Sequence, residues 1–327
     1  MKRREFITLL GGAAASAWPL AARAQQAMPV IGLLGGESRG AAGFRVDAFR
    51  QGLAETGYVE GRNVAFEYRF ADGHYDRLPA LATELARSQV AAIATLGPTL
   101  SALAAKTATT TIPIVFYIGA DPVKVGLISR LNKPEGNVTG ITVLYNVIVA
   151  KQLEMLQEMV PKADAIGWLV NPANSNSPSD TSDAQAAAGV LGRKLIVVPA
   201  STATQLESAF STLADQRVGA VLVQPDNFLR SRTSQVVDLA KSHHLAMLCP
   251  YRDCTIAGGL ISYGASAPDA HRQQGTYAGR ILKGEKPSDL PVVQPTKFEL
   301  VINLKTAKAL GINVPLIMQM TANEVVE

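Results

Sequence analysis

The seven residues VIGLLGG, at positions 30–36, decide the fold class. A short apolar run that stops at two glycines is typical of a strand buried inside a parallel sheet. Apolar residues then recur at helical spacing from Phe44 to Leu53, and residues 64–68 alternate between apolar and polar positions. The order strand, helix, strand indicates an α/β fold built from right-handed crossovers.

The same alternation continues along the chain and then starts again. This repeat predicts two similarly wound, Rossmann-like α/β lobes with parallel sheets, joined by a multi-strand hinge. The further strands are expected at 90–96 and 112–118 in the first half, and at 166–170, 195–198 and 218–223 in the second, with helices at 78–85, from about 100, at 184–191 and at 206–213.

The chain is too long for one hydrophobic core. Its 327 residues are 47% hydrophobic and only 18% charged, which predicts folded lobes rather than disorder. We expect three crossings between the lobes, because several crossings make a hinge that bends while each lobe stays rigid. The crossings are expected near 138–142, 258–263 and 291–295, which gives a first lobe of 28–140 plus 256–287 and a second lobe of 141–255 plus 288–327.

The N-terminus has the pattern of an export signal. Three basic residues at 2–4 precede an apolar stretch at 6–20, and Ala22-Arg23-Ala24 is a small-x-small cleavage site. The adjacent arginines resemble a twin-arginine signal, which exports a folded protein. We therefore expect residues 1–24 to be removed and the mature protein to lie in the periplasm. A retained membrane anchor is the alternative.

The net charge does not predict nucleic-acid binding. The whole chain carries +4, but three of these charges belong to the first 24 residues, so the remainder carries only +1. A protein that binds DNA or RNA usually presents a strongly basic face. We therefore expect no nucleic-acid partner.

The candidate ligand site lies beyond the carboxyl ends of the strands, where parallel sheets bind ligands. Five loops follow apolar strands, precede helices and are rich in small or hydrogen-bonding residues. Aromatic residues near these ends can stack on the body of a ligand. This pattern suits a small zwitterion. The candidate residues are Gly36, Glu37, Ser38, Gly97, Thr99, Ser101, Tyr117, Asp121, Tyr145, Asn171, Asn174, Ser175, Asn176, Asp226, Asn227, Phe228, Tyr251 and Tyr263.

Each polar candidate also has a purely structural interpretation. Thr99 and Ser101 stand at a helix start, where free backbone N–H groups attract carboxylates, yet Thr99 serves equally well as a cap. Asp121, followed by Pro122, is better explained as an ordinary helix start. Asp226 is either a ligand contact or a cap. The asparagines either bind the ligand or satisfy backbone groups of their loop.

The remaining chemistry of the sequence favours no catalyst. Cys249 and Cys254 either pair in an oxidising compartment or remain two buried thiols. No residues show metal-ligand spacing, and we expect no cofactor. The adjacent His243 and His244 cannot both face one site. The sequence also contains no Gly-x-Ser-x-Gly, P-loop or His-Glu-x-x-His motif, so we expect no enzyme activity.

Several longer motifs carry a resemblance to a known family. The chain resembles the tryptophan/tyrosine-type ABC transporter substrate-binding proteins, which have the type I periplasmic binding fold. One loop departs from the family pattern of Gly-Thr-Pro followed by alanines, because it reads Gly97-Pro98-Thr99-Leu100-Ser101 here and leaves the ligand identity open. The matching stretches are residues 2–8, 21–26, 112–116, 121–123, 136–140, 257–264 and 290–303.

The resemblance implies a function. A monomeric exported receptor would capture an amino-acid-like solute, aromatic in some members, and deliver it unchanged to the permease subunits of an ABC importer. Contacts with the solute are implied at the loops named above. A sensing subunit that presents the solute to a membrane receptor is an alternative on the same fold, as is an enzyme. A repressor is disfavoured, since the export signal occupies the place of a DNA-binding helix-turn-helix.

Overall fold

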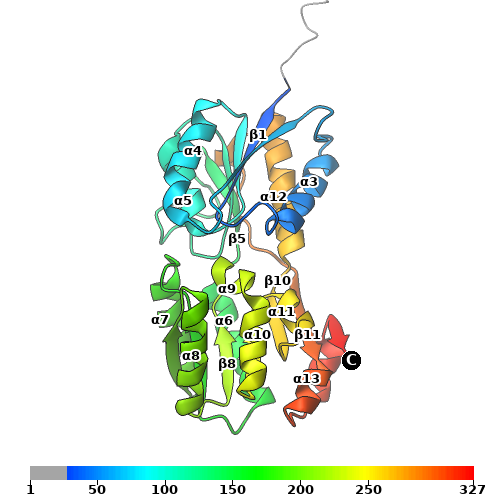
Figure 1. The fold of residues 1–327 in the computed structure, drawn as a ribbon. Coiled ribbons are helices and arrows are strands. Elements are labelled where there is room, and N and C mark those ends of the chain that lie inside the picture. The colour runs from blue at the N-terminus through cyan, green and yellow to red at the C-terminus, as the bar shows by residue number, and fades with distance from the viewer. Residues whose placement is uncertain (1–27) are drawn as a thin grey trace, which may run out of the picture.

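Two separate sheets organise the chain in the computed structural model, which describes residues 28–327. Their strand orders are β2-β1-β3-β4-β5 and β12-β11-β10-β9-β8-β6-β7. Figure 1 shows the resulting lobes stacked one above the other, with helices on both faces of each sheet. The predicted two-lobed α/β fold is confirmed. The predicted export signal lies outside the described residues.

The first lobe is built on five parallel strands. In β1, Ile31 and Leu33 pack toward one helical layer, whereas Leu34 packs toward the other, as the alternation along a buried strand requires. Helices α4 and α5 cover one face, and α3 and α12 cover the other. The elements are β1 (Val30–Gly35), α3 (Gly43–Glu55), β2 (Ala65–Phe70), η1 (Tyr75–Arg77), α4 (Leu78–Arg87), β3 (Ala92–Thr95), α5 (Thr99–Ala108), β4 (Ile114–Ile118), β5 (Val138–Thr142), α12 (Ala267–Leu282) and η2 (Pro287–Asp289).

The second lobe continues the pattern with a larger sheet. All its strand pairs are parallel except β10 with β11. The elements are α6 (Tyr145–Met159), β6 (Ala165–Val170), α7 (Ser177–Val190), β7 (Lys194–Pro199), α8 (Ala203–Asp215), β8 (Ala220–Val223), α9 (Asn227–Ser231), α10 (Thr233–Ser242), β9 (Ala246–Cys249), α11 (Arg252–Ile256), β10 (Ile261–Ala265), β11 (Phe298–Asn303), α13 (Leu304–Ala309), α14 (Leu316–Thr321) and β12 (Glu324–Val326).

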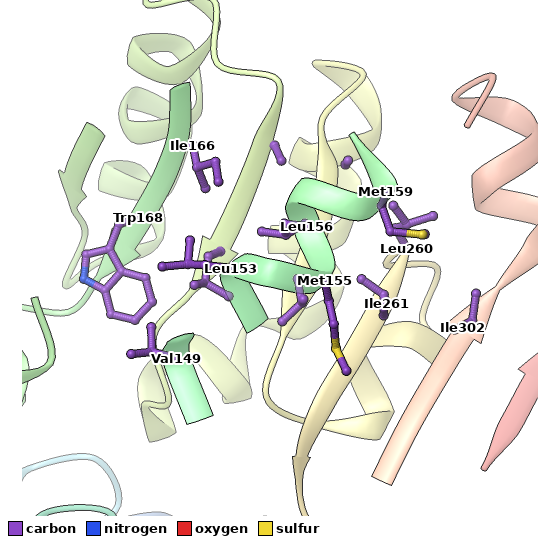
Figure 2. Close-up of a cluster of buried hydrophobic side chains, with 14 of the residues drawn as sticks. Val149, Leu153, Met155, Leu156, Met159, Ile166, Trp168, Leu260, Ile261 and Ile302 are labelled. Carbon is purple, nitrogen blue, oxygen red and sulfur yellow. The ribbon is translucent and has the colours of Figure 1, made fainter. Parts of the chain in front are cut away.

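The core of the second lobe centres on α6. Figure 2 shows Leu153 and Leu156 of this helix between Trp168 on one side and Ile261 on the other. Trp168 is 1% exposed, and its indole N–H donates to Thr181 Oγ1 over 3.1 Å, so its polar atom is satisfied inside the core. Within residues 28–327, no helix combines the length and apolarity needed to span a bilayer.

The second predicted crossing between the lobes is wrong. We expected the chain to return to the first lobe near 258–263, but β10 belongs to the second sheet, where it pairs with β9 and β11. The return comes only with α12, which packs against α3. The segment after α12 then remains in the first lobe, because Thr139 Oγ1 donates to the carbonyl of Leu290 over 2.7 Å and Val293 bridges to Ile141.

Two glycines allow α3 and α12 to touch. A Cβ on Gly52 would overlap the backbone carbonyl of Arg272, and a Cβ on Gly275 would overlap that of Phe49. The helices therefore approach each other at backbone distance. This contact fixes α12, the first element after the chain returns to the first lobe.

We expect Gly275→Ala to lower the free energy of unfolding by about 1–3 kcal/mol, because the added methyl group forces the two backbones apart. Gly189→Ala is the matched control. Gly189 lies in α7 with no atom within 4 Å of an added Cβ, so the same change should stabilise the protein by about 0.5–1 kcal/mol. Thermal denaturation measures both variants, and equal melting temperatures would contradict the proposed contact.

Candidate ligand-binding site

A cavity lies between the facing loops of the two lobes, at the carboxyl ends of both sheets. Its free space of about 50 Å³ holds only a few water molecules, since one needs about 10–15 Å³. A larger ligand therefore requires the lining side chains to adjust. The polar and aromatic lining residues are Arg45, Thr99, Tyr117, Tyr145, Asn174, Asn176, Asp226, Asn227, Arg230 and Tyr251, together with the backbone of Gly97.

The start of α5 brings Thr99 to the cavity. No side chain caps this helix, so Thr99 is its first residue rather than its cap. Its Oγ1 instead accepts a hydrogen bond from Asn176 Nδ2 of the second lobe over 3.2 Å. Ser101 turns inward and donates to the carbonyl of Pro98 over 2.6 Å. Thr99 therefore links the lobes, whereas Ser101 stabilises its own turn.

Asp226 combines both roles that the sequence left open. It caps α9, since its Oδ1 accepts from the backbone N–H of Leu229 over 2.9 Å, and it also lines the cavity. Asn171 Nδ2 donates to the same Oδ1 over 3.1 Å. Burial raises the pKa of Asp226, although these hydrogen bonds oppose the shift. An ammonium group of a ligand would favour the carboxylate form.

Arg45 was missed by the sequence analysis. It lies on the buried face of α3, is 6% exposed and forms an ion pair with Glu37. Asn227 of the second lobe completes the group, because its Oδ1 accepts from Arg45 over 3.3 Å and its Nδ2 donates to Glu37 over 3.1 Å. Burial alone would lower the pKa of Arg45, but Glu37 and nearby tyrosines keep it above its ordinary value. The sequence did contain one signal for this position. Arg45 lies four residues before Phe49 and therefore falls on the apolar face of the predicted helix.

Arg230 was also missed, and no pattern in the sequence marks it. Its guanidinium lies 4.3 Å from the ring centre of Tyr251 and 4.6 Å from that of Phe44, which belongs to the other lobe. Asp253 holds it through hydrogen bonds of 3.0 to 3.2 Å. Stacking on two rings gives a cation–π contact that spans the cleft.

Tyrosines form the aromatic wall of the cavity. Burial raises the pKa of Tyr251 to about 12 and also raises the pKa of Tyr117 and Tyr145, so all three hydroxyl groups are neutral. Behind Tyr117 lies His271, with ring centres 4.3 Å apart. Burial lowers the pKa of His271 to about 3, so it is a neutral imidazole at physiological pH. The wall can therefore donate and accept hydrogen bonds without carrying charge.

The other predicted residues lie outside this cavity. Asp121 Oδ1 accepts from the backbone of Val123 and Lys124, the local role that the sequence favoured. Tyr263 stacks on Phe298, with ring centres 5.8 Å apart, in the second sheet. Ser175 is exposed. An adjacent hollow of about 340 Å³ is lined by Gly36, Glu37, Ser38, Asn171 and Phe228, and it shares Asn227 with the cavity.

The structure decides the pairing of the two cysteines, which the sequence left open. Cys249 and Cys254 form a disulfide, so the alternative of two separate thiols is wrong. Among residues 28–327, no three His, Cys, Asp or Glu side chains are placed to hold a metal ion together.

The family described as ABC transporter substrate binding protein matches residues 29–326. The chain belongs to this family. It is 27% identical over 262 residues to the tyrosine-binding protein of Clostridioides difficile (strain R20291), covering 80% of this chain and 75% of the relative. A Streptococcus ABC domain in complex with L-Trp matches with a TM-score of 0.84 and 25% identity, over 92% of this substrate-binding protein and 100% of that chain.

Two further solved structures resemble this substrate-binding protein to different degrees. A ligand-free, open substrate-binding protein from Clostridium difficile gives a TM-score of only 0.69 at 26% identity, over 91% of this chain and 99% of that one. A conserved domain protein from Vibrio cholerae gives a TM-score of 0.85 at 26% identity, over 91% of this chain and 100% of that one. The better match to the L-Trp complex than to the open form agrees with the hydrogen bonds across the cleft. The lobes are closed on each other in the structure, because Asn176 and Asn227 of the second lobe form hydrogen bonds with the first lobe.

Buried Gln224 orders the loop that carries Asn171. Its Oε1 accepts from the backbone N–H of Asn171 over 3.0 Å and from Ser177 Oγ over 2.9 Å. Its Nε2 donates to Asp180 Oδ2 over 2.8 Å. Burial raises the pKa of Asp180 from 3.8 to about 6. The folded state therefore binds this proton more tightly than the unfolded state.

We expect Asp180→Asn to stabilise the protein above pH 6, by on the order of 2 kcal/mol, and to have little effect near pH 4. A raised folded pKa contributes stability below the unfolded pKa, and this contribution is lost as pH rises through about 6. The amide oxygen can still accept from Gln224. Asp164→Asn, at a fully exposed carboxylate, is the control. Thermal denaturation from pH 4 to pH 8 tests this prediction. Parallel curves of melting temperature against pH for wild type and Asp180→Asn would contradict it.

Proposed function

We propose that this protein is an exported receptor that captures a small amino-acid-like solute with a planar or aromatic body. It would close around the solute and deliver it unchanged to the permease subunits of an ABC importer. The observation that carries the proposal is one interlobe cavity where two arginines, one aspartate and three tyrosines meet. Membership of the family supports a small-molecule ligand and a permease partner.

The lining suits each part of a zwitterion. Asp226 offers a carboxylate to an ammonium group, and the start of α5 at Thr99 offers free backbone N–H groups to a carboxylate. Arg45 adds positive charge beside the same space. Tyr117 and Tyr251 give a planar ring two aromatic faces. The relative that is named a tyrosine-binding protein and the L-Trp complex support this ligand class.

Closure couples this recognition to transport. Only a solute that contacts both lobes can stabilise the closed form, because a ligand shifts an equilibrium by its differential affinity. The closed receptor then presents a composite surface to the permease. We propose that residues 1–24 direct the protein to the periplasm, where it acts as a monomer and performs no catalytic step. A sensing subunit with the same site would differ in the membrane protein that it binds.

We expect Asp226→Asn to weaken binding of L-tyrosine and L-tryptophan by about 10-fold to 100-fold, because an ammonium group loses a charged hydrogen-bond partner. The amide oxygen can still cap α9, so the fold should persist. Asp121→Asn is the matched control, because Asp121 also follows a strand but faces no cavity. Isothermal titration calorimetry of the mature protein measures the affinities.

The ligand class itself is tested first with the wild-type protein. A thermal-shift screen of amino acids and small organic acids should find at least one aromatic amino acid that raises the melting temperature, because only the folded state binds. Small-angle scattering should show a smaller radius of gyration with that ligand. No stabilisation by any amino acid would overturn the proposed class, and equal affinities for the two aspartate variants would remove Asp226 from the site.

A further inference from the structure

The disulfide lies next to the ligand site rather than at the periphery of its lobe. Cys249 is the last residue of β9 and Cys254 lies in α11, with Cα atoms 6.5 Å apart. Only four residues, 250–253, separate them. Their loop follows the carboxyl end of a strand, which is the position of the other loops that line the cavity.

Two of these four residues act at the cavity. Tyr251 lines it directly and stacks against Arg230. Asp253 also holds Arg230, through hydrogen bonds of 3.0 to 3.2 Å. Arg230 in turn contacts Phe44 of the first lobe. The loop closed by the disulfide therefore sets both an aromatic wall of the cavity and a contact across the cleft.

The other interactions that hold this loop are noncovalent. Arg252 pairs with Glu324, but both side chains are more than a third exposed, and such pairs contribute little. A Cβ on Gly264 of β10 would overlap the backbone carbonyl of Pro250, so the loop backbone lies close to this strand. The disulfide adds a covalent cross-link between the end of β9 and α11, beyond the main chain that joins them.

The interior of the lobe can accommodate the reduced form. Cys249 is 2% exposed and Cys254 is 5% exposed, and both pack in an apolar cluster with Val237 and Met247. Free cysteine is among the most buried residue types, so two thiols fit this environment. Breaking the bond should therefore free the loop without unfolding the lobe.

We propose that the Cys249–Cys254 disulfide is a positioning element of the ligand site, so that its reduction lowers affinity for solute by releasing Tyr251 and Asp253. A dithiol reductant supplies two electrons and two protons. The S–S bond breaks to two cysteine thiols, and the reductant closes to its own cyclic disulfide. The effect on affinity rests on the proposed function, whereas the effect on the loop does not.

The loop is tested without ligand. Amide hydrogen exchange is measured over residues 250–254 and 227–232 in the oxidised protein, in the protein reduced with dithiothreitol, and in C249A/C254A. The reduced wild type keeps both sulfur atoms in the core, so it controls for the smaller alanine side chains. We expect faster exchange in these two segments and unchanged exchange in α7. Unchanged exchange in residues 250–254 would overturn the proposal.

The ligand site is tested with L-tyrosine and L-tryptophan by titration calorimetry. We expect reduction and C249A/C254A each to raise Kd by about tenfold, the size of effect expected when a stacking contact and a charged contact are both weakened. A merely structural disulfide would lower the melting temperature and leave Kd unchanged, and that result would overturn the proposal.

A double-mutant cycle separates positioning from general loosening. Tyr251→Ala should raise Kd about tenfold in the oxidised protein but about twofold or less in C249A/C254A, where Tyr251 is already released. Asn174→Ala, in a loop without a disulfide, should have the same effect in both backgrounds. An equal effect of Tyr251→Ala on Kd in the oxidised protein and in C249A/C254A would overturn the proposal. If neither amino acid binds the oxidised wild type, the proposed ligand class fails, and the exchange measurement alone decides the role of the disulfide.

Discussion

The closed arrangement depends on the buried ion pair of Glu37 and Arg45, both of which form hydrogen bonds with Asn227 of the opposite lobe. Both charged side chains are 8% exposed, and burying such a pair costs several kcal/mol per ion unless hydrogen bonds complete it. Asn227, from the opposite lobe, supplies that completion on both partners. Opening the cleft removes Asn227 and lets water replace it. The network therefore differs between the two states in what completes it, which is Asn227 in the closed form and water in the open form.

A single turn of helix connects ligand recognition with this closure. Asp226 caps α9 and faces the cavity, Asn227 joins the ion pair, and Arg230 stacks on a ring of the first lobe. A solute that shifts Asp226 must shift the other two, because all three lie on a helix of five residues and its cap. In the structure, Asn227 and Arg230 of α9 contact Arg45 and Phe44 of α3, so this turn lies directly against the first lobe.

The sequence was sufficient to predict those features of the fold and the site that depend on local residue patterns. Strand ends and their loops were placed within a few residues, because apolar runs and turn residues mark them, and most cavity residues follow from the rule that parallel sheets bind ligands at their carboxyl ends. Arg45 and Arg230 could not be assigned in this way, since Glu37, Asp253 and Phe44 become their partners only in the fold. Tyr263 was misplaced for a related reason. The sheet to which β10 belongs is set by pairing with β11, nearly forty residues away.

The time at which the disulfide forms depends on the order of folding and export. If the proposed twin-arginine signal operates, the protein folds in a reducing compartment and reaches an oxidising one already folded. Cys249 and Cys254 are then two buried thiols when the lobe forms, and their Cα separation of 6.5 Å lies inside the range that a disulfide spans without backbone movement. The reduced, folded receptor would thus be the precursor of the exported, oxidised receptor. Oxidation fixes Tyr251 only after export, so a receptor with full affinity would exist only in the compartment where its solute is captured.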